Sequence, residues 1–208
     1  DVLKIPAEKL RVITPDVGGG FGMKLFLYAE HVLGTYAAKK LGKPVKWTSE
    51  RTEAFLSDTQ GRDNLTRGEI ALDADGKILA LRVSTLANMG AYLSNFAPFI
   101  PTLAGTRVLS VQYRMPAIYV EVEGVFTNTV PIDAYRGAGR PEANYLVERL
   151  MDKAAREIGI DAAELRRRNF IPPGAMPYQT PSRLNYDSGE VAQNLELAVK
   201  AADRARFP

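Results

Sequence analysis

The sequence of 208 residues has no cysteine, one histidine (His31) and no apolar run approaching the length of a membrane span. The lack of cysteine excludes disulfides, thiolate-bound zinc, iron–sulfur clusters and a cysteine nucleophile within this chain. A single histidine cannot build a histidine-ligated metal site. A membrane span needs about 20 apolar residues, and no signal segment opens the chain. We expect a cytoplasmic protein without a membrane span.

The net charge is also small, because 27 Lys and Arg oppose 24 Asp and Glu for a net charge of +3. This basic excess is too small to predict nucleic-acid binding. The hydrophobic content of 46% and charged content of 25% are typical of a globular domain. The first residue is Asp1 rather than methionine, and we expect a piece cut from a longer polypeptide.

Apolar periodicity predicts both strands and helices. Strand patterns cover residues 10–14, 45–48, 65–72, 78–85 and 118–126, and helix patterns cover 25–41, 51–56, 141–158 and 191–202. Residues 65–72 and 78–85 form a predicted hairpin across Asp75-Gly76, and Asp161 is a predicted helix cap. Hairpins and crossovers occur together, so the fold class is α+β, with mixed sheets and packed helices.

The first of two glycine-rich loops spans residues 18–22 (GGGFG) and precedes the helix pattern at 25–41. It is not a phosphate-binding P-loop, because Leu25 rather than a hydroxyl residue follows Lys24. The dinucleotide fingerprint would need glycine where Met23 stands. Glycines ahead of a helix let backbone N–H groups approach a bulky or anionic ligand. A simple tight turn fits the pattern equally well.

The second loop spans residues 134–140 (AYRGAGR) and precedes the helix that Pro141 opens. Arg136 and Arg140 flank the glycines, and an arginine fork suits a phosphate or a polar heterocycle. Two solvated arginines near a turn are the alternative. Two such loops in one small domain favour a shared ligand.

Four segments in order resemble the molybdenum-binding subunit of the xanthine dehydrogenase / aldehyde oxidase family. The first loop in its context is PDVGGGFGMK (residues 15–24), and the second is AYRGAGRPEA (residues 134–143). Residues 167–173 (RRNFIPP) and 186–189 (YDSG) resemble downstream segments. The resemblance covers nearly the whole chain, and it includes bacterial large subunits similar to carbon monoxide dehydrogenase.

The resemblance implies a fragment of a molybdenum hydroxylase, which uses water-derived hydroxide to oxidise an aldehyde or N-heteroaromatic carbon. In this family molybdopterin holds the molybdenum, often as a cytosine dinucleotide in bacteria, and a glutamate acts as general base. Electrons leave through iron–sulfur clusters to FAD on other subunits or domains. The absence of cysteine agrees with clusters that lie elsewhere, and the resemblance implies an oligomeric full-length enzyme with a small-molecule substrate.

The resemblance also implies which residues bind the cofactor. Phe21 matches a phenylalanine whose main chain lies beside the molybdenum centre, and Gly20 and Gly22 match its flanking glycines. Arg136 matches an arginine whose backbone lies near the cofactor. Supporting positions are Gly19, Gly137 and Gly139.

At several positions this sequence differs from known members of the family, and these differences restrict the reactions that the resemblance implies. Leu25 stands where xanthine dehydrogenases carry a substrate-binding glutamate, which argues against purine hydroxylation. Ala138 stands where purine and aldehyde enzymes often place a stacking aromatic residue. Gly137 stands where carbon monoxide dehydrogenase carries a copper-binding cysteine, so that copper chemistry is excluded.

The catalytic glutamate has no counterpart here, because the family places it near the end of a much longer chain. Glu190 follows Gly189, but an acidic residue at a helix start is ordinary dipole chemistry. We therefore expect residues 1–208 to be a single domain, the N-terminal part of a molybdopterin-binding region. It would hold no catalytic residue and be inactive alone. The alternative is a non-catalytic binding or interaction module on the same scaffold.

Other residues have simpler interpretations. His31 is expected on a helix, and Trp47 in the core. The aromatic residues Tyr92, Phe96 and Phe99 could line a substrate channel, although core packing is favoured. The run at 166–168 (RRR) is interpreted as a solvated helix face, with a contact to another part of the enzyme as the alternative.

Overall fold

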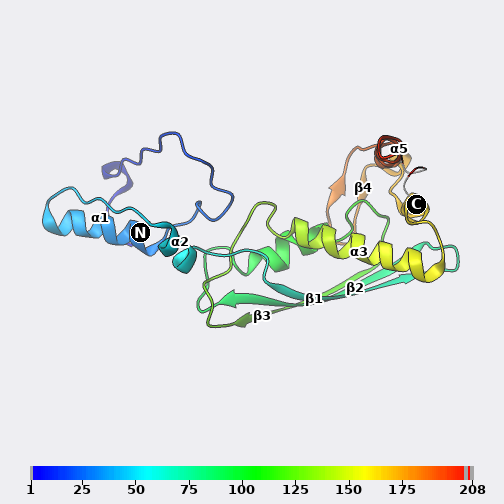
Figure 1. Ribbon diagram of the computed structural model, residues 1–208, viewed down its shortest axis with the longest axis horizontal. Helices are drawn as coiled ribbons and strands as arrows, with labels where there is room; N and C mark the ends of the chain where they lie inside the picture. Colours follow the sequence, from blue (N-terminus) through cyan, green and yellow to red (C-terminus); the bar gives the residue numbers. More distant parts are fainter. Residues whose placement is uncertain (1, 204–205, 207–208) are drawn as a thin grey trace.

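The computed structural model describes residues 2–203 and 206 and confirms the α+β fold class. Two parts follow each other along the long axis (Figure 1). The arm (residues 2–57) holds η1 (Ala7–Lys9), α1 (Ala29–Leu41) and α2 (Arg51–Ser57). The body (residues 64–203) holds the main sheet and the remaining helices, and a connector (residues 58–63) joins the two.

The body is built on a three-stranded mixed sheet in the order β1-β2-β3. β1 (Asn64–Leu72) and β2 (Ile78–Gly90) are antiparallel, which confirms the predicted hairpin, and β2 runs on past the predicted end at residue 85. Its turn is fixed by Asp73, whose Oδ1 accepts from the backbone N–H groups of Asp75 and Lys77. β3 (Ile118–Phe126) was also predicted and lies parallel to β2.

The long helix α3 (Arg140–Ile158) covers one face of the sheet (Figure 1). Its fully buried Val147 and Met151 share one core cluster with Leu81 and Val83 of β2. The helix lies so close to β1 that a Cβ at Gly68 would be 2.8 Å from Leu146 Cδ1. As predicted, α3 ends at Gly159, which adopts the left-handed conformation (φ +70°) that glycine favours at a helix C-terminus.

The remaining elements pack at the end of the body that is far from α1 (Figure 1). α4 (Ala162–Asn169) begins as predicted at Asp161, whose side chain accepts from the N–H groups of Ala163 and Glu164. The segment after α4 contains η4 (Pro173–Ala175) and a short hairpin of β4 (Tyr178–Gln179) and β5 (Asn185–Tyr186). The predicted last helix is α5 (Val191–Ala201).

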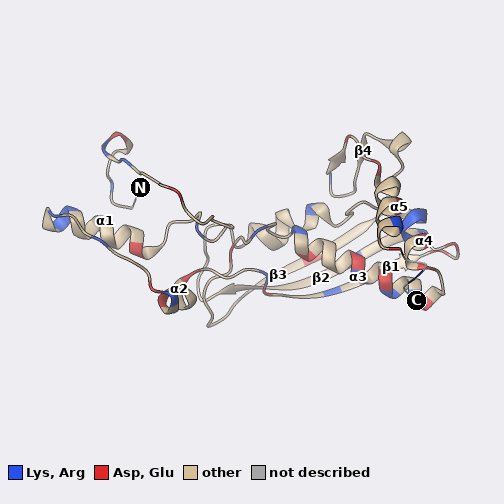
Figure 2. Cartoon of the chain, turned by 45° about the horizontal axis from the view of Figure 1, so that its top comes forward, with Lys and Arg blue, Asp and Glu red and all other residues tan. Residues whose placement is uncertain are grey.

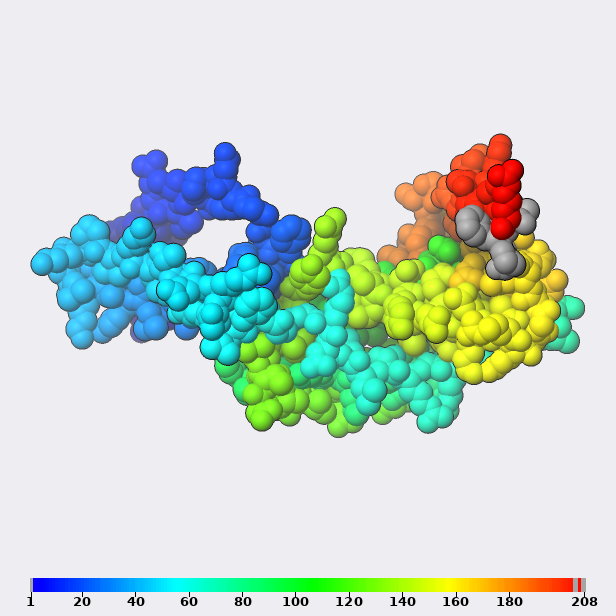
Figure 3. All heavy atoms as spheres, in the orientation of Figure 1, coloured from blue at the N-terminus to red at the C-terminus, as the bar shows by residue number. Residues whose placement is uncertain are grey.

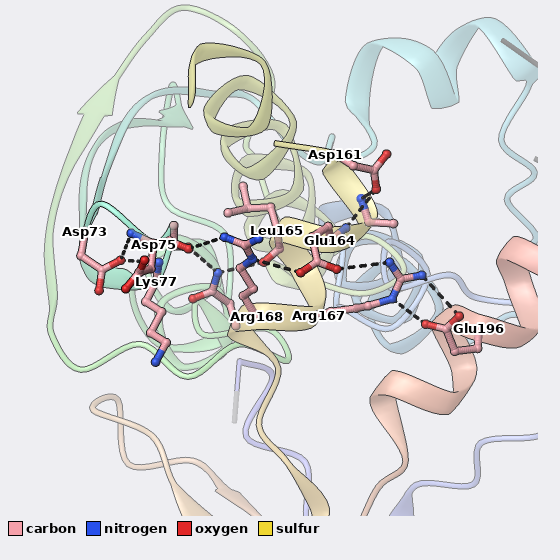
Figure 4. Close-up of polar contacts among 12 residues, drawn as sticks. Asp73, Asp75, Lys77, Asp161, Glu164, Leu165, Arg167, Arg168 and Glu196 are labelled. Atoms are coloured by element: carbon pink, nitrogen blue, oxygen red, sulfur yellow. Dashed lines mark hydrogen bonds and ion pairs between the residues drawn. The ribbon is translucent and has the colours of Figure 1, made fainter. Parts of the chain in front are cut away.

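Arg167 and Arg168 of α4 are exposed, in keeping with the solvated face that the sequence favoured, but Arg166 is partly buried. Arg166 lies 2.7 Å from Glu148 and 2.9 Å from Asp152, both on α3. Figure 4 shows Arg167 paired with Glu196 of α5 and Arg168 reaching the turn between β1 and β2. Burial alone would lower the pKa of Arg166, but hydrogen bonds to Glu148 and Asp152 raise it. The run therefore ties α4 to its neighbours, and Figure 2 shows charge of both signs along these helices.

The arm departs most from the sequence-based prediction. Residues 10–14 and 45–48 form no strand, because no other described segment pairs with them, and an isolated strand is not stable. Trp47 is 45% exposed, so its expected place in the core is wrong. Helix α1 begins at Ala29 instead of residue 25, since turns of the first glycine loop occupy residues 21–26. No residue of α1 or α2 is buried.

In Figure 3 the dark-blue residues of the arm arch away from α1 and leave an opening between them. Across residues 2–203, no helix is both long and apolar enough to cross a bilayer.

Candidate functional site

The two glycine loops meet where the arm joins the body. The backbone N–H of Arg136 donates a 2.9 Å hydrogen bond to the carbonyl oxygen of Phe21. At Gly22, which has a φ of +101°, a Cβ would lie 2.3 Å from the carbonyl oxygen of Ala134. Only glycine fits that conformation and that approach. The structure thus brings Phe21, Gly22 and Arg136 together in one surface.

The first loop presents an aromatic side chain on a strained backbone. Phe21 has a left-handed φ of +52° and is 51% exposed. Non-glycine residues rarely adopt this conformation, and it concentrates at functional sites. A Cβ at Gly19 would lie 2.8 Å from the Phe21 ring. Glycine at position 19 therefore leaves the space that the ring occupies.

Exposed hydrogen-bond donors line both loops. Among the described residues, no hydrogen bond engages the backbone N–H groups of Gly19, Gly20, Phe21 and Gly137, and all four residues are exposed. Arg136 is also exposed, and its guanidinium has no hydrogen-bond or ion-pair partner among the described residues. Successive free N–H groups beside a cation suit a large anionic ligand with many acceptor atoms. These residues fit a phosphate-bearing pterin cofactor.

The two glycines of the second loop have different surroundings. Gly137 is exposed, and a Cβ there would lie 2.6 Å from the ring of Pro141. Gly139 is buried, and a Cβ there would lie 2.6 Å from the backbone nitrogen of Gly105. Gly105 directly follows η2 (Ile100–Ala104), and η3 (Thr106–Val108) comes next. Gly139 therefore sets close packing at the start of α3, while Gly137 lies on the surface.

An aromatic segment borders the second loop. The buried Asp133 accepts from the N–H of Ala134 at 2.6 Å and from the N–H of Phe96 at 3.2 Å. The Phe96 ring lies 5.5 Å from that of Phe26, which follows the first loop, and 6.3 Å from that of Phe99. Phe96, Phe99 and Tyr92 are all substantially exposed, so the favoured core packing is wrong. Phe96 and Phe99 form an aromatic rim beside the loops.

Sequence reasoning missed the connector, which contacts the second loop and the segment directly after the first loop. Asp58 pairs with Lys24 at 2.6 Å, Gln60 bridges to Ile132 ahead of the second loop, and Arg62 donates to the carbonyl oxygen of Arg136. A glycine pattern cannot reveal these residues, since their contacts depend on how the arm meets the body. The only local signal is the concentration of polar side chains around Gly61.

The side chains of the described residues offer no ready-made metal site. No three of the His, Cys, Asp and Glu residues among them gather to hold a metal ion. His31 lies on α1 as predicted, and its Nδ1 accepts from the N–H of Tyr28. Glu190 lies at the start of α5, as expected. A metal at the loops would have to arrive with its own ligand.

Comparison with known proteins identifies one family and several relatives. The family model described as "Molybdopterin cofactor-binding domain" matches residues 1–170. The carbon monoxide dehydrogenase large chain of Hydrogenophaga pseudoflava is 39% identical, over 96% of this chain and 25% of that protein. The 6-hydroxypseudooxynicotine dehydrogenase complex subunit gamma of Paenarthrobacter nicotinovorans is 35% identical, over 97% of this chain and 26% of that protein.

A solved structure shares the fold as well. Quinoline 2-oxidoreductase from Pseudomonas putida 86 superimposes with a TM-score of 0.88 at 34% identity, over 93% of this chain and 25% of that one. The chain therefore spans about a quarter of the length of these relatives.

Proposed function

Since this chain belongs to the molybdopterin cofactor-binding domain family, we propose that it supplies the two cofactor-binding loops of a molybdenum hydroxylase large subunit. The observation that carries the proposal is the meeting of the loops through Arg136 and Phe21. The exposed, unpaired N–H groups around that contact would bind the acceptor atoms of the cofactor. Gly19, Gly20, Phe21, Gly22, Arg136 and Gly137 are the proposed cofactor-binding residues, with Gly139 in a packing role.

The chain's own residues would bind and orient rather than react. The cofactor, when bound, supplies a molybdenum centre that oxidises carbon with oxygen derived from water. The main chain at Phe21 would lie beside that centre, and the Arg136 guanidinium would hold an anionic part of the cofactor. No residue of this chain is proposed as the general base, so the chain alone is proposed to be inactive.

We propose an aldehyde or an N-heteroaromatic compound as the substrate class. The exposed rings of Phe96 and Phe99 beside the loops would offer flat apolar faces to such a substrate. The relative named for quinoline oxidation supports the heteroaromatic class. Copper-assisted oxidation of carbon monoxide is not proposed, because Gly137 would have to be a cysteine.

Electron transfer would depend on other subunits or domains. We propose iron–sulfur and FAD partners, since a chain without cysteine cannot hold the clusters itself. The relative named as the gamma subunit of a dehydrogenase complex supports a multi-subunit assembly. The nucleotide form of the cofactor is proposed to be the cytosine dinucleotide.

Elemental analysis of the native polypeptide that contains these residues tests the proposal. We expect about one molybdenum per chain, with iron and FAD in the purified complex. Release and mass analysis of the cofactor would identify its nucleotide. A native product without molybdenum would overturn the proposal and favour a non-catalytic binding module on this scaffold.

A further inference from the structure

We propose that the connector (residues 58–63) positions both cofactor loops as one unit, with Arg62 as the principal positioning residue. The inference rests on the proposed function, because it concerns the same site. The inference goes beyond the proposed function because none of the connector residues is proposed to touch the cofactor. The connector would act through the backbone of the loops.

Arg62 joins the second loop to the helix that follows it. Its Nη2 donates to the carbonyl oxygen of Arg136, and its guanidinium lies 4.6 Å from the ring centroid of Tyr135. Its Nε lies 3.7 Å from Glu142 Oε2 in the first turn of α3. Arginine can make these contacts together because its donors form a planar, rigid fork that also stacks on aromatic rings.

The backbone at Arg62 is held in a costly conformation. Its φ of +59° is left-handed although the residue is not glycine. Such conformations persist where surrounding contacts over-determine them, and they cluster at functional sites. The neighbouring Gly61 shows how tight the surroundings are, since a Cβ there would lie 2.6 Å from the Cβ of Tyr135.

The other end of the connector holds the segment directly after the first loop. Asp58, whose side chain is only 12% exposed, lies 2.6 Å from the Nζ of Lys24. The hydroxyl of Tyr28 donates to the carbonyl oxygen of Met23 and lies 3.1 Å from the hydroxyl of Thr59. The segment directly after Gly22 is thereby fixed to the start of the connector.

The middle of the connector is itself anchored to the body. The N–H of Gln60 donates to Pro131 at 3.0 Å, and the N–H of Asp133 donates to Gln60 at 2.8 Å. Asp133 in turn holds the first amide of the second loop. One short segment therefore contacts the residues directly after the first loop at Asp58 and the second loop at Arg62, and we infer that a displacement of one loop would move the other.

The test uses the full-length subunit in its native complex, with Arg62→Gln, Arg62→Lys and the control Arg67→Gln. Arg67 lies on β1 with its side chain 82% exposed, so its loss removes the same charge without touching the loops. Changes to residues that support metal-site ligands typically cost about tenfold or more in metal affinity. We expect Arg62→Gln to lower molybdenum per folded chain by about tenfold, and Arg62→Lys to recover part of it.

A spectroscopic readout separates positioning from general stability. The electron paramagnetic resonance signal of the molybdenum that remains should change shape in Arg62→Gln and match wild type in Arg67→Gln. Equal molybdenum content and an equal signal in Arg62→Gln would overturn the inference. If wild type itself holds no molybdenum, the proposed function fails instead, and the two failures are thus distinct.

Asp58→Asn keeps the inference testable if Arg62→Gln does not fold. Asparagine keeps the size of the side chain but removes the charge that pairs with Lys24. We expect faster amide hydrogen exchange in both loops, including residues 134–140, which Asp58 does not contact. Faster exchange confined to the first loop would show that the connector does not couple them.

Discussion

Gly22 is the residue on which the contact between the two loops depends most directly. Gly22→Ala would place a Cβ 2.3 Å from the backbone oxygen of Ala134, at a φ of +101°. Backbone atoms cannot yield as a flexible side chain can, so the loops must separate. We expect the full-length subunit carrying Gly22→Ala to lose most of its molybdenum, measured per folded chain by elemental analysis.

Gly18 supplies the matched control for that substitution. It lies in the same glycine run, but a Cβ there would have no heavy atom within 4 Å. Gly18→Ala should therefore keep its molybdenum. If both variants retained the metal equally, the contact between the loops would have no part in cofactor binding.

At the scale of elements, local sequence signals predicted most of the body. The hairpin, β3 and α3 follow from apolar periodicity, and Asp161 and Gly159 follow from the chemistry of helix ends. Residues 10–14 carry an equally apolar pattern and form no strand. Periodicity reports the preference of a segment, but pairing needs a partner that the pattern does not specify.

The candidate site was predictable only in part for the same reason. Both loops stand out in the sequence as runs of glycine. The glycines are required there because Gly22 and Gly137 adopt conformations that other residues avoid. That the loops touch depends on tertiary structure. Arg62 and Asp58 have no sequence signature, because their partners lie in loops far along the chain.

The packing of α3 against the segment that precedes β3 makes the free energy of unfolding fall at alkaline pH. Tyr113 is fully buried and donates a 2.7 Å hydrogen bond to Glu148 of α3. Burial foremost, and then this hydrogen bond and the charge of Glu148, raise the pKa of Tyr113 well above its ordinary value of 10.0. The folded state therefore binds this proton more tightly than the unfolded state does.

The sign of the pH effect follows from linkage. A raised folded-state pKa gives a stabilisation that is complete below the unfolded pKa and is lost as the pH rises through the folded one. We expect the stability of wild type relative to Tyr113→Phe to decline above pH 10.0. Urea unfolding of both proteins across this range measures it. A constant difference between them would show that Tyr113 ionises alike in both states.

At the scale of the whole molecule, the arm and the body differ in what holds them together. The body has a core in which Leu81, Val147 and Met151 are almost completely buried. In the arm, α1 and α2 bury no residue, and Val12 is 88% exposed. Apolar burial is the main favourable term in folding. The arm therefore depends on the loop contacts and the connector for its position.

Limited proteolysis of the 208-residue chain tests this division. Local opening needs least free energy where few apolar contacts are buried, so trypsin should cut first in the arm, at Lys39, Lys40 or Lys46. Susceptible bonds are not confined to the arm, because Arg67, Arg82 and Arg149 lie in the body. Mass spectrometry should therefore find one fragment that contains β1 to α5 at early times. Equally early cuts within β2 or α3 would show that the arm is as stable as the body, since exposure of a bond in the core requires the body itself to unfold.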